Sequence, residues 1–130
     1  GRPIIKAFNA IIAKTLADGG KPAGTDNRIA IPVAGDSLAG KAIAQQLLDD
    51  AGFDALDAGT IADSWRQQPG APVYCTNLKY DEIGLALDAA ERERLPKRRD
   101  LGAAIFAERF GWPGTIEREK FIEISRALQM

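Results

Sequence analysis

The chain has 130 residues and a net charge of −1 at pH 7, with 45% hydrophobic and 27% charged residues. These values are typical of a soluble globular protein of one domain, large enough to bury a core. No basic field is present, and no apolar run approaches the roughly 20 residues that cross a bilayer. We therefore expect no nucleic-acid partner, no membrane partner and no secretory signal peptide.

Cysteine and histidine usage narrows the possible chemistry. The single cysteine, Cys75, cannot form an internal disulfide and suits a reducing compartment, which predicts a cytoplasmic protein. No neighbouring residue would activate it, so we interpret it as a buried, small apolar residue. The chain has no histidine, which removes the commonest general base and the commonest metal ligand. We expect no metal site and no catalytic side chain, a composition compatible with a hydride transfer that a cofactor carries.

The first half of the chain alternates strand and helix patterns. Residues 3–9, PIIKAFN, predict a buried central strand, and the apolar spacing of residues 10–17 predicts a short helix that ends at Gly19. Residues 28–34, RIAIPVA, predict a second strand. Pro32 lies inside it and cannot donate to a ladder, so this strand should lie near an edge of the sheet or carry a bulge.

A helix follows, with Asp36 or Ser37 as its N-cap and Gly52 just beyond its C-terminus. Residues 53–58 predict a third strand. Strand, helix and strand in this order form a βαβ unit, which predicts a parallel sheet. The helix should face the core with an apolar stripe of Leu38, Ala42, Ile43, Leu47 and Leu48.

The second half of the chain is predicted to be helical. Residues 80–95 predict a helix, Pro96 interrupts it, and residues 97–110 predict another helix. GWPG at 111–114 predicts a turn, and residues 116–129 predict a last helix. The inward residues should be Ile83, Leu87 and Ala90 in the first of these helices and Ile116, Phe121, Ile124 and Leu128 in the last.

A change of composition near residue 70 suggests two parts. We predict an α/β half-domain at residues 1–66, and a loop with C-terminal helices at residues 67–130. Neither part contains G-x-G-x-x-G or another glycine-rich phosphate loop, so the residues alone give no strong nucleotide signal.

Polar residues at strand ends are the candidate ligand contacts. Asn9 either faces the crevice at a strand end or caps the helix at Ala10, and the two alternatives are equally supported. Lys6 either reaches a surface carboxylate, the reading that the sequence favours, or a cofactor phosphate. In VAGDS, residues 33–37, the helix N-terminus could hold an anion, although a simple cap is the more frequent use of such a turn.

The segment DAGTIADSW, residues 57–65, is a further strand end. Thr60 and Asp63 have the spacing of a near capping box, and Ser64 and Trp65 follow within the first turns. If the strands are parallel, this segment should lie close to Asn9. A structural cap with a packed indole is the simpler alternative.

These motifs resemble the NADP oxidoreductase, coenzyme F-420-dependent family. That family has a strand that ends in K-A-F-N-T, a strand V-x-V-A-G-D-D, a helix, and D-A-G-x-L-x-x-[SA]-R. The corresponding stretches here are residues 6–10, 31–37 and 57–65. Ala10 stands where the family usually has Thr, and Trp65 where many members have Arg. The resemblance covers residues 3–66 and is weak after residue 80.

The resemblance implies the second half of a Rossmann-like NAD(P)-binding sheet, followed by a C-terminal helical segment, with the glycine-rich N-terminal half absent. It implies an oxidoreductase that transfers hydride between NADP, or NAD, and a deazaflavin- or flavin-like acceptor. The implied cofactor contacts are Ala7, Phe8 and Asn9, and the implied acceptor contacts are Gly59, Thr60 and Ser64. It also implies a homodimer.

Two expectations qualify this interpretation. A half-sheet exposes an unpaired edge strand, so the isolated chain should pair that edge with a second copy or exchange elements with one. The chain could instead be a non-catalytic α/β assembly module or a small-ligand-binding module. A G-x-G-x-x-G segment encoded upstream of the chain would separate the two hypotheses.

Overall fold

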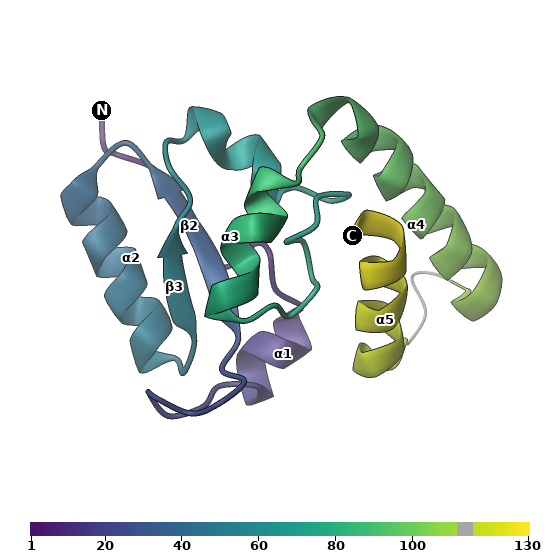
Figure 1. Cartoon of the computed structure of the whole chain (residues 1–130), viewed down its shortest axis with the longest axis horizontal. Coiled ribbons are helices and arrows are strands. Elements are labelled where there is room, and N and C mark those ends of the chain that lie inside the picture. Colours follow the sequence, from purple (N-terminus) through teal and green to yellow (C-terminus); the bar gives the residue numbers. More distant parts are fainter. Residues whose placement is uncertain (112–115) are drawn as a thin grey trace.

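A three-stranded sheet in the order β1–β2–β3 forms the centre of the protein (Figure 1). The computed structural model describes residues 1–111 and 116–130. The strands are β1 (Ile5–Lys6), β2 (Ala30–Gly35) and β3 (Asp54–Asp57). β1 runs antiparallel to β2, and β2 runs parallel to β3. The protein is therefore a mixed α/β fold with a mixed sheet.

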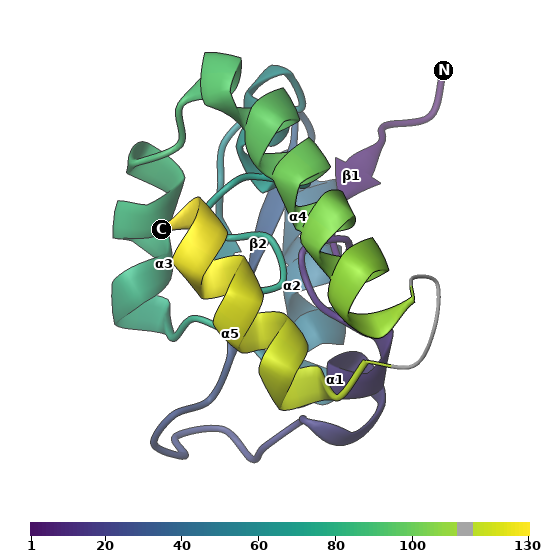
Figure 2. The ribbon, with the colours of Figure 1, turned by 90° about the vertical axis from the view of Figure 1, so that its right-hand side faces the viewer.

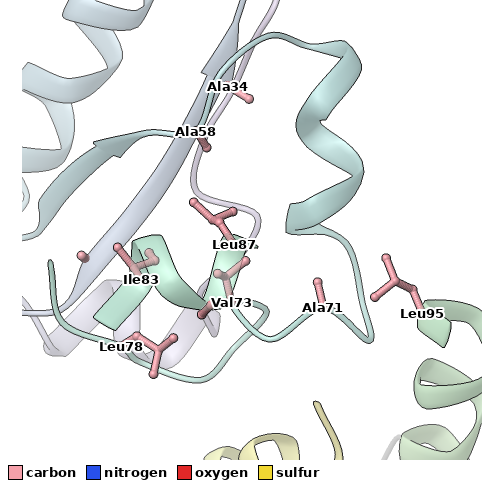
Figure 3. Packing of buried hydrophobic residues seen from close by; sticks show 10 residues of the cluster. Ala34, Ala58, Ala71, Val73, Leu78, Ile83, Leu87 and Leu95 are labelled. Carbon is pink, nitrogen blue, oxygen red and sulfur yellow. The ribbon is translucent and has the colours of Figure 1, made fainter. Parts of the chain in front are cut away.

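The predicted βαβ unit is confirmed as β2, α2 (Leu38–Asp50) and β3. β2 is buried along its whole length because its alternate residues face different layers. Ile31 and Val33 belong to the core that includes Leu48 of α2. Ala30 and Ala34 belong to the core on the other face, which Ile83 and Leu87 of α3 (Tyr80–Asp88) complete (Figure 3).

Pro32 lies in the middle strand of the three, which differs from the predicted edge position or bulge. The odd-numbered residues of β2 form their backbone hydrogen bonds on the side of β3. For example, Ala58 N donates to Val33 O at 2.7 Å. Even-numbered residues bond on the other side, where Ala30 N donates to Leu78 O at 2.8 Å and β1 pairs at Ala34. Pro32 falls between these two pairings, so its missing N–H costs no ladder hydrogen bond.

The remaining elements are α1 (Ala13–Asp18), the 3₁₀ helices η1 (Ala62–Gln67) and η2 (Arg92–Arg94), α4 (Leu95–Phe110) and α5 (Arg118–Gln129). α4 and α5 lie side by side at one end of the molecule (Figure 2). The rings of Phe106 and Phe121 stack between them, with centroids 4.5 Å apart. In the described residues, no helix has the length and hydrophobicity needed to cross a bilayer.

α5 is tied to the loop that precedes α3. Arg126 Nε donates to Thr76 O at 2.7 Å, and the Gln129 amide, with its nitrogen towards the loop, donates to Ala71 O at 2.7 Å. Ser125 and Gln129 are the buried residues of α5. The predicted inward residues Ile116, Phe121, Ile124 and Leu128 are only half-buried around them.

Several predicted boundaries were wrong. Residues 3–9 form a two-residue edge strand rather than a central one, and the helix after it begins at Ala13. The helix predicted at 80–95 ends at Asp88, and Pro96 occupies the first turn of α4, where a missing N–H is tolerated. Gly111 closes α4 with φ 66°. The rest of the predicted turn, 112–114, lies outside the described residues.

The predicted apolar stripe of α2 is mostly wrong. Leu38, Ile43 and Leu47 are exposed to 78%, 64% and 54%. The buried face consists of Lys41, Ala44 and Leu48. A lysine in that face is satisfied by an ion pair, described below, whereas Ile43 and Leu47 lie on the outside.

Candidate functional site

The carboxyl ends of β2 and β3 meet at one rim of the sheet, the usual ligand position in α/β proteins. Gly35 N donates to Gly59 O at 3.0 Å, so the two strand ends are directly bonded. Asp36 Oδ1 accepts from Ile61 N at 3.2 Å and ties the first strand-to-helix turn to the second. We call residues 35–37 and 57–63 the strand-end rim.

Both predicted caps are present at the strand-end rim. Ser37 Oγ accepts from Gly40 N at 3.1 Å and caps α2. Asp63 Oδ2 accepts from the Thr60 hydroxyl at 2.7 Å and from Thr60 N at 3.2 Å. These bonds from Thr60 lower the pKa of the Asp63 carboxyl. Gly59 has φ +95°, so this tight turn needs a residue without a Cβ.

A bidentate ion pair lies beneath the strand-end rim. Lys41 Nζ is 2.8 Å from Asp57 Oδ1 and 2.7 Å from Asp57 Oδ2. Asp57 Oδ1 also accepts from Gly59 N at 2.9 Å. The hydrogen bond from Lys41 lowers the pKa of the Asp57 carboxyl. Both partners are engaged with each other in this arrangement.

The structure corrects the expected position of Ala7, Phe8 and Asn9. Because β1 is antiparallel, Ile5 is the residue opposite Gly35 at the strand-end rim, and the chain then runs away from it. Phe8 adopts φ 62°, and all three residues are half-buried. Asn9 neither faces the strand-end rim nor caps a helix.

The segments that carry the two predicted groups of ligand contacts are joined instead through η1. Lys6 Nζ donates to Ser64 O at 2.9 Å, and Asn9 Nδ2 donates to Gln67 O at 2.7 Å. The Lys6 side chain therefore reaches a backbone carbonyl rather than a carboxylate or a phosphate. Burial lowers the pKa of its ammonium group. η1 thus joins residues 6–9 to the end of the strand-end rim that carries Thr60.

Sequence reasoning missed Gln67 and Lys41. Gln67 is completely buried, and neither its Oε1 nor its Nε2 has a hydrogen-bond partner in the structure. Asn9 Oδ1, whose amide nitrogen bonds the same residue, also has no partner. No sequence signal distinguishes Gln67. Lys41 could have been found, because it precedes Ala44 and Leu48 at helical spacing.

The site therefore offers amides, backbone groups, hydroxyls and the carboxylates of Asp36 and Asp63, rather than free cations. The Arg66 guanidinium is also bonded within the protein, since Nη2 donates to Ala58 O at 2.8 Å. Within residues 1–111 and 116–130, no three acidic, His or Cys side chains gather as metal ligands would. Such a site can orient a ligand through hydrogen bonds.

Comparison with known proteins gives one relative. The chain is 40% identical over 79 residues to the protein YjhV of Escherichia coli (strain K12). The matched residues span 58% of this chain and 58% of that protein, and its name states no activity. No family model matches the chain. No solved structure matches it either.

Proposed function

We propose that the chain is part of an NAD(P)-dependent oxidoreductase that transfers hydride between NADP(H) and a deazaflavin- or flavin-like acceptor. The observation that carries the proposal is the joining of Lys6 and Asn9 to η1. This contact brings the segment KAFN next to the segment DAGTIADS, the two motifs on which the family resemblance rests. Lys6 pairs with β2 next to Gly35, so its contact with Ser64 lies near the carboxyl end of a parallel βαβ unit.

The residues fit one end of the cofactor only. Lys41, Lys6 and Arg66 all have partners within the protein, so the strand-end rim offers no free cation for the phosphates of NADP. Amides and hydroxyls suit the nicotinamide end, which carries a carboxamide and no phosphate. The phosphates would be held by chain beyond these residues, in keeping with a glycine-rich half placed elsewhere in the natural protein.

In this proposal the protein promotes hydride transfer by positioning the nicotinamide and the acceptor ring. A bound NADPH would supply a hydride, with its electron pair, to the acceptor ring. Ala7, Phe8 and Asn9 would hold the nicotinamide, whereas Gly59, Thr60 and Ser64 would hold the acceptor. Holding two rings face to face supplies much of the rate enhancement, and no side chain has to move a proton in the hydride step.

A binding or assembly module is the second candidate. The observation that favours it is the exposed apolar side of α2, where Ile43 and Leu47 lie one helical turn apart. Exposed apolar stripes of this kind are typical of protein contacts. In that case the charged pairs of the strand-end rim serve only to stabilise the fold.

NADPH binding separates the two candidates. The intact mass of the natural gene product would first show whether further residues precede the chain. We expect a longer product to bind NADPH and to oxidise it when a deazaflavin or flavin is added. We expect the 130-residue chain alone to bind it far more weakly. A natural product without G-x-G-x-x-G and without NADPH binding would favour the assembly module.

Variants at the strand-end rim connect the activity to the site. Ser64→Ala removes a hydroxyl but keeps the backbone carbonyl that Lys6 bonds, so it tests acceptor contact without loosening η1. Thr25→Ala in the exposed loop before β2 is the matched control. We expect Ser64→Ala to raise the KM for the acceptor and leave the affinity for NADPH unchanged. Equal kinetics for both variants would remove Ser64 from the site.

A further inference from the structure

A cavity of about 210 Å³ lies between α4, α5 and the loop at residues 69–74, away from the strand-end rim. Its walls include Tyr74, Gly102 and the stacked rings of Phe106 and Phe121. Aromatic walls of this kind hold the apolar body of a small ligand. The polar side chains of the lining are Tyr74, Arg98, Arg99, Ser125 and Gln129, and of these Arg98 and Ser125 have unpaired polar atoms.

Both of these side chains contain a buried polar atom without a partner. Ser125 is 1% exposed, and its hydroxyl has no hydrogen bond in the structure. Arg98 Nη1 is likewise buried and unbonded. Leaving such groups unpaired costs free energy, and a buried guanidinium costs more than a hydroxyl because it is charged. Both residues line the same cavity, so a ligand there could supply the partner that the protein itself does not.

The charge of Arg98 is poorly balanced by its neighbours. Within the part of the chain that the structure describes, its one ion-pair partner is Glu91, with Nη2 3.4 Å from Glu91 Oε1. That oxygen already accepts from Arg94 Nη1 at 2.6 Å. The Arg98 side chain is 13% exposed, whereas that of Glu91 is 53% exposed, so the carboxylate stays mainly in water. An anion within the cavity would balance Arg98 better.

We propose that this cavity binds a small organic carboxylate, with its apolar body against Phe106 and Phe121 and its carboxylate accepting from Arg98 and Ser125. A guanidinium and a hydroxyl are complementary to a carboxylate, and charge-assisted bonds of this kind are strong. Both donor atoms are covered in the unliganded protein, so the two side chains turn towards the ligand on binding. The volume is below the usual 300 Å³ or more of pockets for larger ligands, which excludes a dinucleotide. The proposal is thus independent of the proposed function.

Benzoate and benzamide are matched probes, because they share a ring and differ in charge. We expect benzoate to raise the melting temperature of the 130-residue chain and to shift the NMR signals of α4 and α5. Benzamide and inorganic phosphate, each of which lacks one half of the complementary chemistry, should do neither. Equal responses to benzoate and benzamide would overturn the proposal, and so would benzoate shifts confined to other parts of the protein.

Three variants make the test specific. Ser125→Ala removes an unpaired buried hydroxyl, so it should raise the melting temperature of the free protein while it weakens benzoate binding about tenfold, the loss of one hydrogen bond to a charged group. Arg98→Gln should abolish the benzoate response. Arg109→Gln is the control, because Arg109 is an exposed arginine of the same helix outside the cavity lining. Unchanged benzoate affinity in both Ser125→Ala and Arg98→Gln would contradict the proposal.

Gly102→Ala gives a second measurement that does not depend on charge. A Cβ at Gly102 would lie 3.6 Å from Leu128 Cδ1 and 3.9 Å from Phe106 Cε2, which are ordinary contacts. The variant should therefore fold normally and reduce the space in the cavity. Weaker benzoate binding with unchanged folding is the expected result, and unchanged binding would place the ligand elsewhere.

Discussion

Lys41 and Asp57 form a two-point ion pair that joins α2 to the end of β3, with Nζ 2.8 Å and 2.7 Å from the two carboxylate oxygens. The Lys41 side chain is 9% exposed, whereas that of Asp57 is 46% exposed. This asymmetry matters because a buried ammonium group cannot return to water when its partner is lost, whereas the carboxylate can.

The first prediction follows from that asymmetry. Asp57→Asn leaves a buried charge without a counterion and should lower the free energy of unfolding by about 2 kcal/mol, less than for a fully buried pair because Asp57 is half-exposed. Lys41→Met keeps the length of the side chain and leaves a carboxylate that water and Gly59 N can satisfy, so it should cost less than about 1 kcal/mol. Urea denaturation measures both, and equal losses would contradict the argument.

The second prediction concerns acid. The hydrogen bond from Lys41 lowers the pKa of Asp57 in the folded protein below its ordinary value of about 3.9. Its contribution is therefore complete above about pH 4 and is lost as the pH falls through the lower folded pKa. The stability difference between wild type and Asp57→Asn should narrow below about pH 4. A difference that stays constant down to acid unfolding would exclude this role.

The third prediction tests the turn after β3. Gly59 has φ +95°, and an added Cβ would lie 3.0 Å from Asp63 Oδ2. Gly59→Ala should therefore destabilise the protein by about 1–3 kcal/mol. Gly84→Ala is the matched control in α3, where an added Cβ meets nothing within 4 Å. Helix propensity makes that change stabilising by up to about 1 kcal/mol, so thermal melts should shift in opposite directions.

Local signals predicted the βαβ unit and its caps. Ser37, Gly52 and the Thr60–Asp63 pair each act within a few residues of chain, and the structure has them as predicted. Such features depend on sequence spacing more than on distant contacts.

The rest depended on partners that sequence spacing does not show. The segment PIIKAFN has strand composition, but the pairing of Lys6 and Asn9 with η1 breaks the strand after two residues. The buried face of α2 contains Lys41, and its ion pair with Asp57 makes that position compatible with burial, against the apolar count. Hydrophobic pattern alone gave the wrong side because it treats a lysine as a surface residue.

The fourth prediction concerns Cys75. It is 4% exposed, and burial raises the pKa of its thiol to about 12, so it is almost entirely protonated at neutral pH. The thiolate is the reactive form. Native protein should therefore resist a thiol-specific reagent that modifies the urea-unfolded chain at once. Rapid modification of the native protein would show that the loop around Cys75 opens.

The fifth prediction compares two adjacent leucines of α2. Leu48 is fully buried in the core, whereas Leu47 is 54% exposed. Leu48→Ala should cost about 2–5 kcal/mol, and Leu47→Ala should stay within about 0.5 kcal/mol of wild type in the monomer. If the predicted homodimer forms through the apolar side of α2, Leu47→Ala should also weaken it. Denaturation measures the stability of both variants, and sedimentation measures their association. A large loss of monomer stability in Leu47→Ala would show that Leu47 packs in the core, as the sequence pattern predicted.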